Sequence, residues 1–402
     1  MKKLLALCLA ALLAVAGISV FAGCSRDDGT VKVGFIALHD KNSTYDKNFI
    51  EAIEQVCKEK NVTLDLRTGI PEDDTCYQTA CELADDGCDV IFADSFSHEQ
   101  FVVRAAKEYP EVQFCHATGV TGHTGEVKNF HNAFASIYEG RYLAGVAAGM
   151  KLAEMRDNNE LTAANYDSGV LGQGNIKIGY VGAYPYAEVI SGYTAFYLGA
   201  KSIVENLIMD VEFTGSWNDQ TKEKETATTF ITNGAALISQ HADSLGAPSA
   251  CEEKGVPNVA YNGNTSTTCP KTYLVATRIN WVPYFEYMID CVLEGEEIDY
   301  DWCGTLATGS VVVEALGKNA AEGTQAKLDE VKAKLMSGEL HVFDCSKFTV
   351  GGQTISSALA DIDGDYTAET QVVEDGIYYE SKLRSAPYFD LKIDGINAHT
   401  DN

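Results

Sequence analysis

Polar and aromatic side chains gather directly after five hydrophobic segments of the chain. They occupy residues 39–46, 94–96, 240–244 and 262–264, and Trp217. Two of them, Tyr45 and Trp217, offer flat aromatic faces, and the others could hydrogen-bond the edge of a ring: Asp46, Asp94, Ser95, His241, Asp243 and Asn262. This set suits a flat ligand that carries hydrogen-bond donors, because rings stack on aromatic faces and carboxylates accept from N–H and O–H groups.

A simpler interpretation exists for three of these residues. Asp46, Ser95 and Asp243 lie near the starts of predicted helices and could serve only as N-caps. The convergence of five such loops favours a shared ligand, because the carboxyl ends of parallel strands meet at one edge of a sheet.

The motifs of common enzymes and metal sites are incomplete in this sequence. No G-x-S-x-G string occurs, and Gly172-Gln173-Gly174 lacks the third glycine of a dinucleotide fingerprint. Residues 361–365 suggest a calcium loop, but Val372 stands where a bidentate glutamate is required, so a turn is expected. The spacing of His116, His123 and His131 does not fit one helical face. We therefore expect no catalytic residue, no cofactor and no metal.

Hydrophobic periodicity predicts alternating strands and helices, which indicates an α/β fold with parallel sheets. The alternation runs through residues 31–135, restarts after a glycine-rich loop, and continues through residues 136–272. It predicts two similar lobes joined by a hinge, with a cleft between them. We expect residues 275–308 to complete the first lobe and residues 309–345 to complete the second. Residues 346–402 are rich in Gly, Asp and Tyr and predict short β-hairpins packed on the outside.

The first residues predict export and attachment to a membrane. Two lysines, an apolar run and small residues before Cys24 are typical of a signal peptide over residues 1–23. Ala22-Gly23-Cys24 resembles a bacterial lipobox, which implies a diacylglycerol on Cys24 and a tether over residues 24–30. An ordinary secretory signal or an uncleaved membrane helix is the alternative. We expect a lipid-anchored protein on the extracytoplasmic face of the cell membrane.

Composition limits the partners. The chain has 402 residues, with 30 basic and 58 acidic side chains and a net charge of −28. A surface this acidic repels phosphate backbones, and we therefore expect no nucleic-acid partner. The negative charge also favours a monomer. Beyond Cys8 and Cys24, ten cysteines remain, for which pairs such as Cys251 with Cys269 are plausible and the reduced state is equally open.

Several strings together resemble the basic membrane protein family of lipoproteins, whose members bind purine nucleosides or nucleobases for ABC import. They are residues 42–49, 138–145, 188–192, 238–244 and 278–284, within a resemblance that extends from about residue 31 to residue 343. The resemblance implies a two-lobed, periplasmic-binding-protein-like type I fold, an ABC permease as partner, and no catalysis. It also implies base stacking by Tyr45 and Trp217. Polar contacts to the base or ribose would come from Asp46, Asp94, Asp243 and Asn262.

The sequence departs from the family pattern in places, and other functions stay open as alternatives. Tyr45-Asp46 stands where the nucleoside-binding pattern has Phe-Asn, and Trp217 with residues 240–244 is more similar to the branch that takes a free base such as adenine. A sensory lipoprotein with the same ligand, or a receptor of the same fold for a sugar or another heterocycle, are alternatives. An enzyme acting on nucleosides in the same cleft would require a constellation that the sequence lacks.

Overall fold

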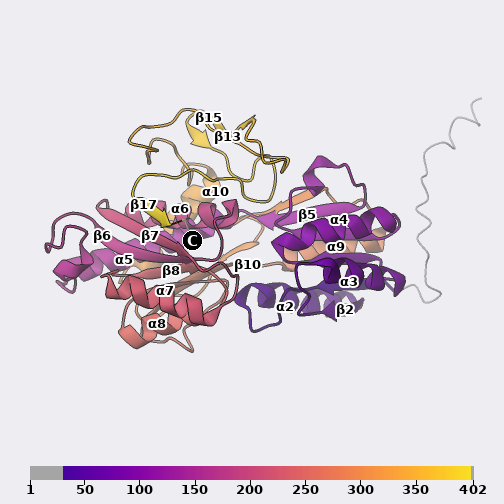
Figure 1. The fold of residues 1–402 in the computed structure, drawn as a ribbon, viewed down its shortest axis with the longest axis horizontal. Helices are drawn as coiled ribbons and strands as arrows, with labels where there is room; N and C mark the ends of the chain where they lie inside the picture. Colours follow the sequence, from indigo (N-terminus) through magenta and orange to yellow (C-terminus); the bar gives the residue numbers. More distant parts are fainter. Residues whose placement is uncertain (1–29, 400–402) are drawn as a thin grey trace, which may run out of the picture.

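The computed structural model describes residues 30–399, which form two α/β lobes side by side with a smaller region lying across them (Figure 1). The signal peptide and Cys24 fall outside the described residues. Within residues 30–399, no helix is long and apolar enough to cross a membrane.

The first lobe is built on a six-stranded sheet of order β11-β5-β4-β3-β1-β2, with every neighbouring pair parallel. Its strands are β1 (Lys32–Ile36), β2 (Thr63–Arg67), β3 (Val90–Ala93), β4 (Gln113–Ala117), β5 (Phe130–Ala135) and β11 (Asp301–Gly304). Apolar residues of α2 (Thr44–Lys60) and α9 (Val282–Glu294) pack on one face, and those of α3 (Asp74–Asp85) and α4 (Glu99–Glu108) pack on the other. Burial on both faces is the arrangement expected of a parallel sheet.

The second lobe contains a seven-stranded sheet of order β12-β10-β9-β8-β6-β7-β17, in which only β12 runs antiparallel to its neighbour. The strands are β6 (Ile176–Gly182), β7 (Leu207–Phe213), β8 (Ile238–His241), β9 (Asn258–Tyr261), β10 (Tyr273–Ile279), β12 (Val311–Val313) and β17 (Ile396–His399). Its helices are α5 (Ile137–Asp157), α6 (Ala187–Lys201), α7 (Gln220–Thr232), α8 (Gly246–Lys254) and α10 (Thr324–Ser337). These two lobes confirm the predicted α/β architecture.

The chain passes between the lobes three times: after β5, after β10 and after β11. One predicted boundary is wrong. We expected the return to the first lobe at about residue 275, but β10 pairs with β9 through Thr277 and Tyr261 in the second sheet, so the return follows Ile279. The strand is buried at every position except Arg278, and periodicity alone could not assign it to a sheet.

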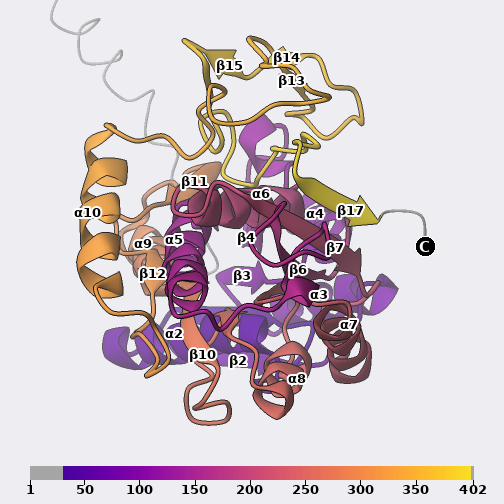
Figure 2. The same cartoon turned by 90° about the vertical axis from the view of Figure 1, so that its left-hand side faces the viewer.

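The C-terminal region lies over both lobes (Figures 1 and 2). It contains two antiparallel strand pairs, β13 (Leu359–Ala360) with β14 (Thr370–Gln371) and β15 (Val373–Glu374) with β16 (Ile377–Tyr378). It does not remain wholly outside the lobes, because β17 joins the second sheet in parallel with β7. Within residues 30–399, no disulfide joins any of the ten cysteines.

Candidate ligand-binding site

A cavity with about 380 Å³ of empty space lies between the two lobes at the carboxyl ends of their strands. The first lobe supplies Leu38, His39, Tyr45, Asp46, Ser95, Phe96 and Thr118 to its wall, and the second supplies Glu188, Trp217, His241, Asp243, Tyr261 and Asn262. Polar groups at strand ends in an otherwise aromatic and apolar wall are characteristic of small-molecule sites.

The structure brings nearly all of the predicted site residues into this wall. The residues that line it as expected are Tyr45, Asp46, Ser95, Trp217, His241, Asp243 and Asn262. Asp94 is the exception, because its fully buried side chain lies outside the lining. Whether each residue contacts a ligand stays a prediction.

Helix capping does not account for Asp46, Ser95 or Asp243. The N-cap of α2 is Ser43, whose hydroxyl accepts from the Asp46 N–H. Ser95 precedes a short 3₁₀ turn without capping it, and its hydroxyl donates to Glu72 Oε1 at 2.6 Å. The N-cap of α8 is Leu245, and the Asp243 carboxylate is bonded elsewhere. The three polar side chains are therefore free of the capping role that could have explained them.

Asp46 is buried and paired with His39. Its Oδ1 accepts the His39 backbone N–H at 2.7 Å, and its Oδ2 lies 3.3 Å from His39 Nδ1. Burial pushes the pKa of Asp46 upward, but hydrogen bonds from His39 and Ser43 outweigh it and leave the pKa below its ordinary value. The hydrogen bond to Asp46 raises the pKa of His39. The pair thus holds an ionised carboxylate, a strong acceptor, at the cavity wall.

Asp94 supports the cavity from behind. Its Oδ1 accepts the Leu38 N–H at 3.1 Å, its Oδ2 has no hydrogen-bond partner, and its backbone carbonyl accepts the Tyr45 hydroxyl at 2.9 Å. Burial, with the nearby Asp46 charge, raises the pKa of Asp94 well above its ordinary value and favours the neutral acid. Asp94 therefore holds the Leu38 loop and the Tyr45 ring in place.

On the second lobe, a buried network fixes the orientation of His241. Its Nε2 lies 3.4 Å from Glu188 Oε1, and its ring packs 4.2 Å from that of Tyr261. Behind it, Arg141 donates to the Tyr180 hydroxyl at 3.2 Å and to Ser239 Oγ at 2.7 Å. Burial lowers the pKa of His241, so the neutral imidazole is favoured.

Asp243 and Asn262 form a polar pair on the second lobe. Asn262 Nδ2 donates to Asp243 Oδ1 at 2.9 Å, and burial raises the pKa of Asp243 well above its ordinary value. Asn262 has a left-handed backbone with φ of 58°, a conformation that asparagine tolerates better than most residues and that concentrates at functional sites.

The same segments hold the lobes against each other. The Thr44 N–H and hydroxyl both donate to the Asp243 carbonyl at 3.1 Å, and Asn48 Nδ2 donates to the Asn262 carbonyl at 2.8 Å. Because these bonds join α2 of one lobe to strand ends of the other, the structure is a closed form.

Aromatic rings line the way from the cavity to the outside. Trp217 lies 5.3 Å from the Tyr184 ring, and Tyr184 stacks on Tyr186 at 5.2 Å. Tyr186 stacks in turn on Phe96 of the other lobe at 5.1 Å. The rings of both lobes thus meet beside the cavity.

Several lining residues were missed as site residues. Glu188 lies in the first turn of α6, where an acidic side chain can be explained simply by its favourable interaction with the helix dipole. Tyr261 ends β9, and Thr118 and Leu38 follow β4 and β1. Extending the strand-end rule by one residue in each direction would have included Tyr261 and Thr118.

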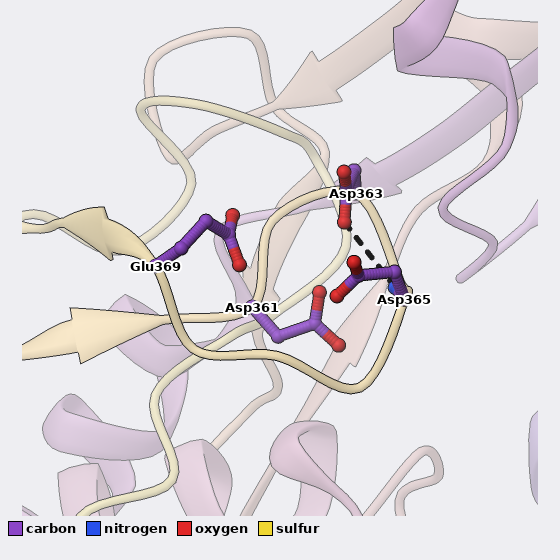
Figure 3. Close-up of side chains that lie close together, drawn as sticks. All are labelled: Asp361, Asp363, Asp365 and Glu369. Carbon is purple, nitrogen blue, oxygen red and sulfur yellow. Dashed lines mark hydrogen bonds between the residues drawn. The ribbon is translucent and has the colours of Figure 1, made fainter.

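The C-terminal region contains an acidic cluster (Figure 3), none of whose residues lines the ligand cavity. Ligand atoms of Asp361, Asp363, Asp365 and Glu369 lie within 4.8 Å of one another, in the loop between β13 and β14. The Asp361 carboxylate already accepts the N–H groups of Gly364 and Tyr366, at 2.8 and 2.9 Å. These bonds are those of a tight acidic turn, and the expectation of no metal stays a prediction.

Two α/β lobes with a polar and aromatic cavity at their strand ends define the class of hinged, two-lobed binding proteins. The family model described as ABC transporter substrate-binding protein PnrA-like matches residues 33–345. The chain therefore belongs to this family, which consists of binding proteins and is not a class of enzymes.

Proteins with similar sequences include a purine-binding protein of Brucella abortus. It is 28% identical over 333 residues, which cover 81% of this chain and 86% of that protein. A nucleoside-binding protein of an ABC transporter from Lactococcus lactis is 27% identical, over 61% of this chain and 67% of its own. A Haloferax volcanii protein named as glucose-binding is 29% identical, over 65% of this chain and 60% of its own.

Among solved structures, an ABC transporter solute-binding protein of Aeropyrum pernix superposes with a TM-score of 0.65 at 14% identity, over 81% of this chain and 94% of its own. One from Conexibacter woesei gives 0.60 at 20% identity, over 78% and 98%. These likenesses confirm the periplasmic-binding-protein-like fold.

Proposed function

We propose that this protein is the extracytoplasmic receptor of an ABC importer, and that it binds a purine base or nucleoside between its lobes and delivers it to the permease. The observation that carries the proposal is the composition of the cavity wall. Tyr45 from one lobe and Trp217 from the other supply aromatic faces, and the hydrogen-bonding side chains of Asp46, Asp243 and Asn262 lie beside them. A purine has two flat faces and N–H donors at its edge, which such a wall can match.

The names of two relatives support this ligand class, and the lipobox-like Ala22-Gly23-Cys24 supports a lipid anchor. A receptor of this kind needs no catalytic group, so we propose that the protein is not an enzyme. Closure around the ligand presents one surface made of both lobes, which a permease can distinguish from the open form.

A sugar is the second candidate. The Haloferax volcanii relative is named as glucose-binding, and a pyranose ring also packs on aromatic faces while its hydroxyls donate to carboxylates. The two candidates differ because a sugar offers many hydroxyl donors, whereas a purine offers a flat π-system.

The experiment is a thermal-shift screen of residues 25–402, expressed without the lipid, followed by calorimetry. The set contains adenine, guanine, adenosine, guanosine, uridine, ribose, glucose and riboflavin. A ligand that binds only the folded state stabilises it by mass action and so raises Tm. At a ligand concentration of a hundred times Kd, the gain in stability is about 2.7 kcal/mol. A shift with purines alone supports the proposal. A shift with glucose or ribose alone refutes it and favours the sugar receptor.

A further inference from the structure

The C-terminal extension (residues 346–402) lies beyond the part of the chain that matches the family model, and its described residues, 346–399, contact both lobes. Its firmer attachment is to the second lobe. There β17 pairs with β7 from Ile396 opposite Met209 to His399 opposite Glu212. The fully buried Phe389 ring also stacks on Phe343 at 4.1 Å.

The attachment to the first lobe is smaller. The Ser385 N–H and hydroxyl donate to the two carboxylate oxygens of Asp301, at 2.7 and 2.5 Å, and Asp301 begins the edge strand β11 of the first sheet. Gly364 lies against Val120, so closely that an added Cβ would be 2.5 Å from Val120 Cγ2. The attachments to the first lobe thus include a pair of hydrogen bonds from Ser385 and the close approach of Gly364 to the Val120 side chain, and Ser381 also interacts with Cys303 of β11.

A buried arginine keeps this end of the extension in shape. The Arg384 guanidinium donates to the carbonyls of Ile362, Ala386 and Pro387 at 2.8, 3.2 and 3.1 Å. These bonds join the Gly364 turn to the segment that carries Ser385. The two contacts with the first lobe therefore move as one unit.

The extension also forms one wall of a groove beside the ligand cavity. Phe96, Thr118 and Glu188 line both the groove and the cavity. The extension contributes Tyr366, Arg384, Tyr388 and Asp390 to the groove, opposite residues of both lobes. A ligand that passes through this groove would pass along the extension.

From these contacts we infer that the C-terminal extension is a strap that limits the opening of the lobes and thereby slows ligand exchange. Hinge opening moves Asp301 with the first lobe and β17 with the second. The Ser385–Asp301 bonds must then break, because two hydrogen bonds are weaker than a paired strand with a buried aromatic core. The effect on ligand exchange rests on the proposed function, whereas the limit on opening does not.

The test uses Ser385→Asp, which places a second carboxylate against Asp301 and leaves β17 intact. Asp301→Asn is the second variant, should Ser385→Asp not fold. Thr349→Ala is the matched control, because it removes a hydrogen bond to Asp394 inside the extension that does not reach the first lobe. Each protein is stripped of ligand by unfolding and refolding, and folding is checked by circular dichroism.

Small-angle X-ray scattering without ligand measures opening directly. We expect a larger radius of gyration for Ser385→Asp than for the wild type, with Thr349→Ala unchanged. Stopped-flow with adenine should show association and dissociation both faster, by about tenfold for the loss of a charged hydrogen bond.

The strap is overturned if the scattering curve of a folded Ser385→Asp variant superimposes on that of the wild type. If Ser385→Asp does not fold, the same comparison is made with a folded Asp301→Asn variant. A scattering difference without adenine binding keeps the strap and counts against the purine proposal. The two failures are therefore separable.

Discussion

Replacing Trp217 by alanine removes one of the two aromatic side chains, Trp217 and Tyr261, that the second lobe presents to the cavity, without altering the main chain beside it. The Trp217 carbonyl accepts the Asp243 N–H at 2.8 Å, and this bond does not depend on the side chain. The ring is only half-buried and packs against Tyr184, so its loss costs the fold little. A change in affinity can then be assigned to the ligand contact.

The expected loss follows from stacking. Removing an aromatic partner of a base costs about 1–3 kcal/mol, which corresponds to a Kd about 5 to 150 times weaker. Calorimetry with adenine and adenosine measures it, and Trp217→Phe is the control that keeps a flat face and should lose much less. Unchanged purine affinity in a folded Trp217→Ala variant would refute the stacking role.

Three further predictions concern the site and the anchor. Asp94→Asn should leave the free energy of unfolding nearly unchanged, because burial already favours the neutral acid. Asp94→Ala should lower it by about 1–3 kcal/mol, because the Leu38 N–H loses its acceptor. Chemical denaturation measures both variants, and equal losses would contradict the neutral state. The His39–Asp46 pair should stabilise the folded state most between about pH 4 and 6.5. The pKa of Asp46 is lowered, so its contribution is present above the ordinary value of 3.8 and is lost as the pH falls. The pKa of His39 is raised, so its contribution is complete below 6.5 and is lost as the pH rises. The difference in unfolding free energy between wild type and His39→Gln should therefore peak in that window, and a difference that does not vary with pH would exclude the charged pair. Cys24→Ser should abolish labelling by radioactive palmitate in the producing cells and release the protein from the membrane fraction, and labelling that persists would exclude the anchor.

The position of the cavity could be predicted from the sequence because a parallel sheet places all strand ends at one edge. Tyr45, Trp217 and Asn262 follow strands whose hydrophobic runs are plain, and the structure brings them to one cavity. The direction of each side chain was less predictable. Asp94 follows its strand as expected, but its side chain turns behind the wall, where Oδ1 accepts the Leu38 N–H.

Strands that pair over long sequence separations escaped prediction. β5 and β11 lie side by side, with Asn132 opposite Asp301, although strands β6 to β10 of the second sheet intervene between them in the chain. A four-residue strand such as β11 carries too little periodicity to be recognised, and its position depends on the neighbour that it finds. The same holds for β12 and β17, which join the second sheet at its two ends.

The last of these strands bears on how the strap can be tested. β17 covers β7, which would otherwise be the edge of the second sheet, and Phe389 of the same extension covers Phe343. Deleting residues 346–402 would expose a sheet edge and a buried ring together, and both promote aggregation. A truncated protein that binds ligand poorly would therefore say nothing about hinge opening. A contact that reports on the strap must be one whose loss leaves both sheets complete, and the hydrogen bonds of Ser385 to Asp301 meet this condition and can be removed by one side-chain substitution.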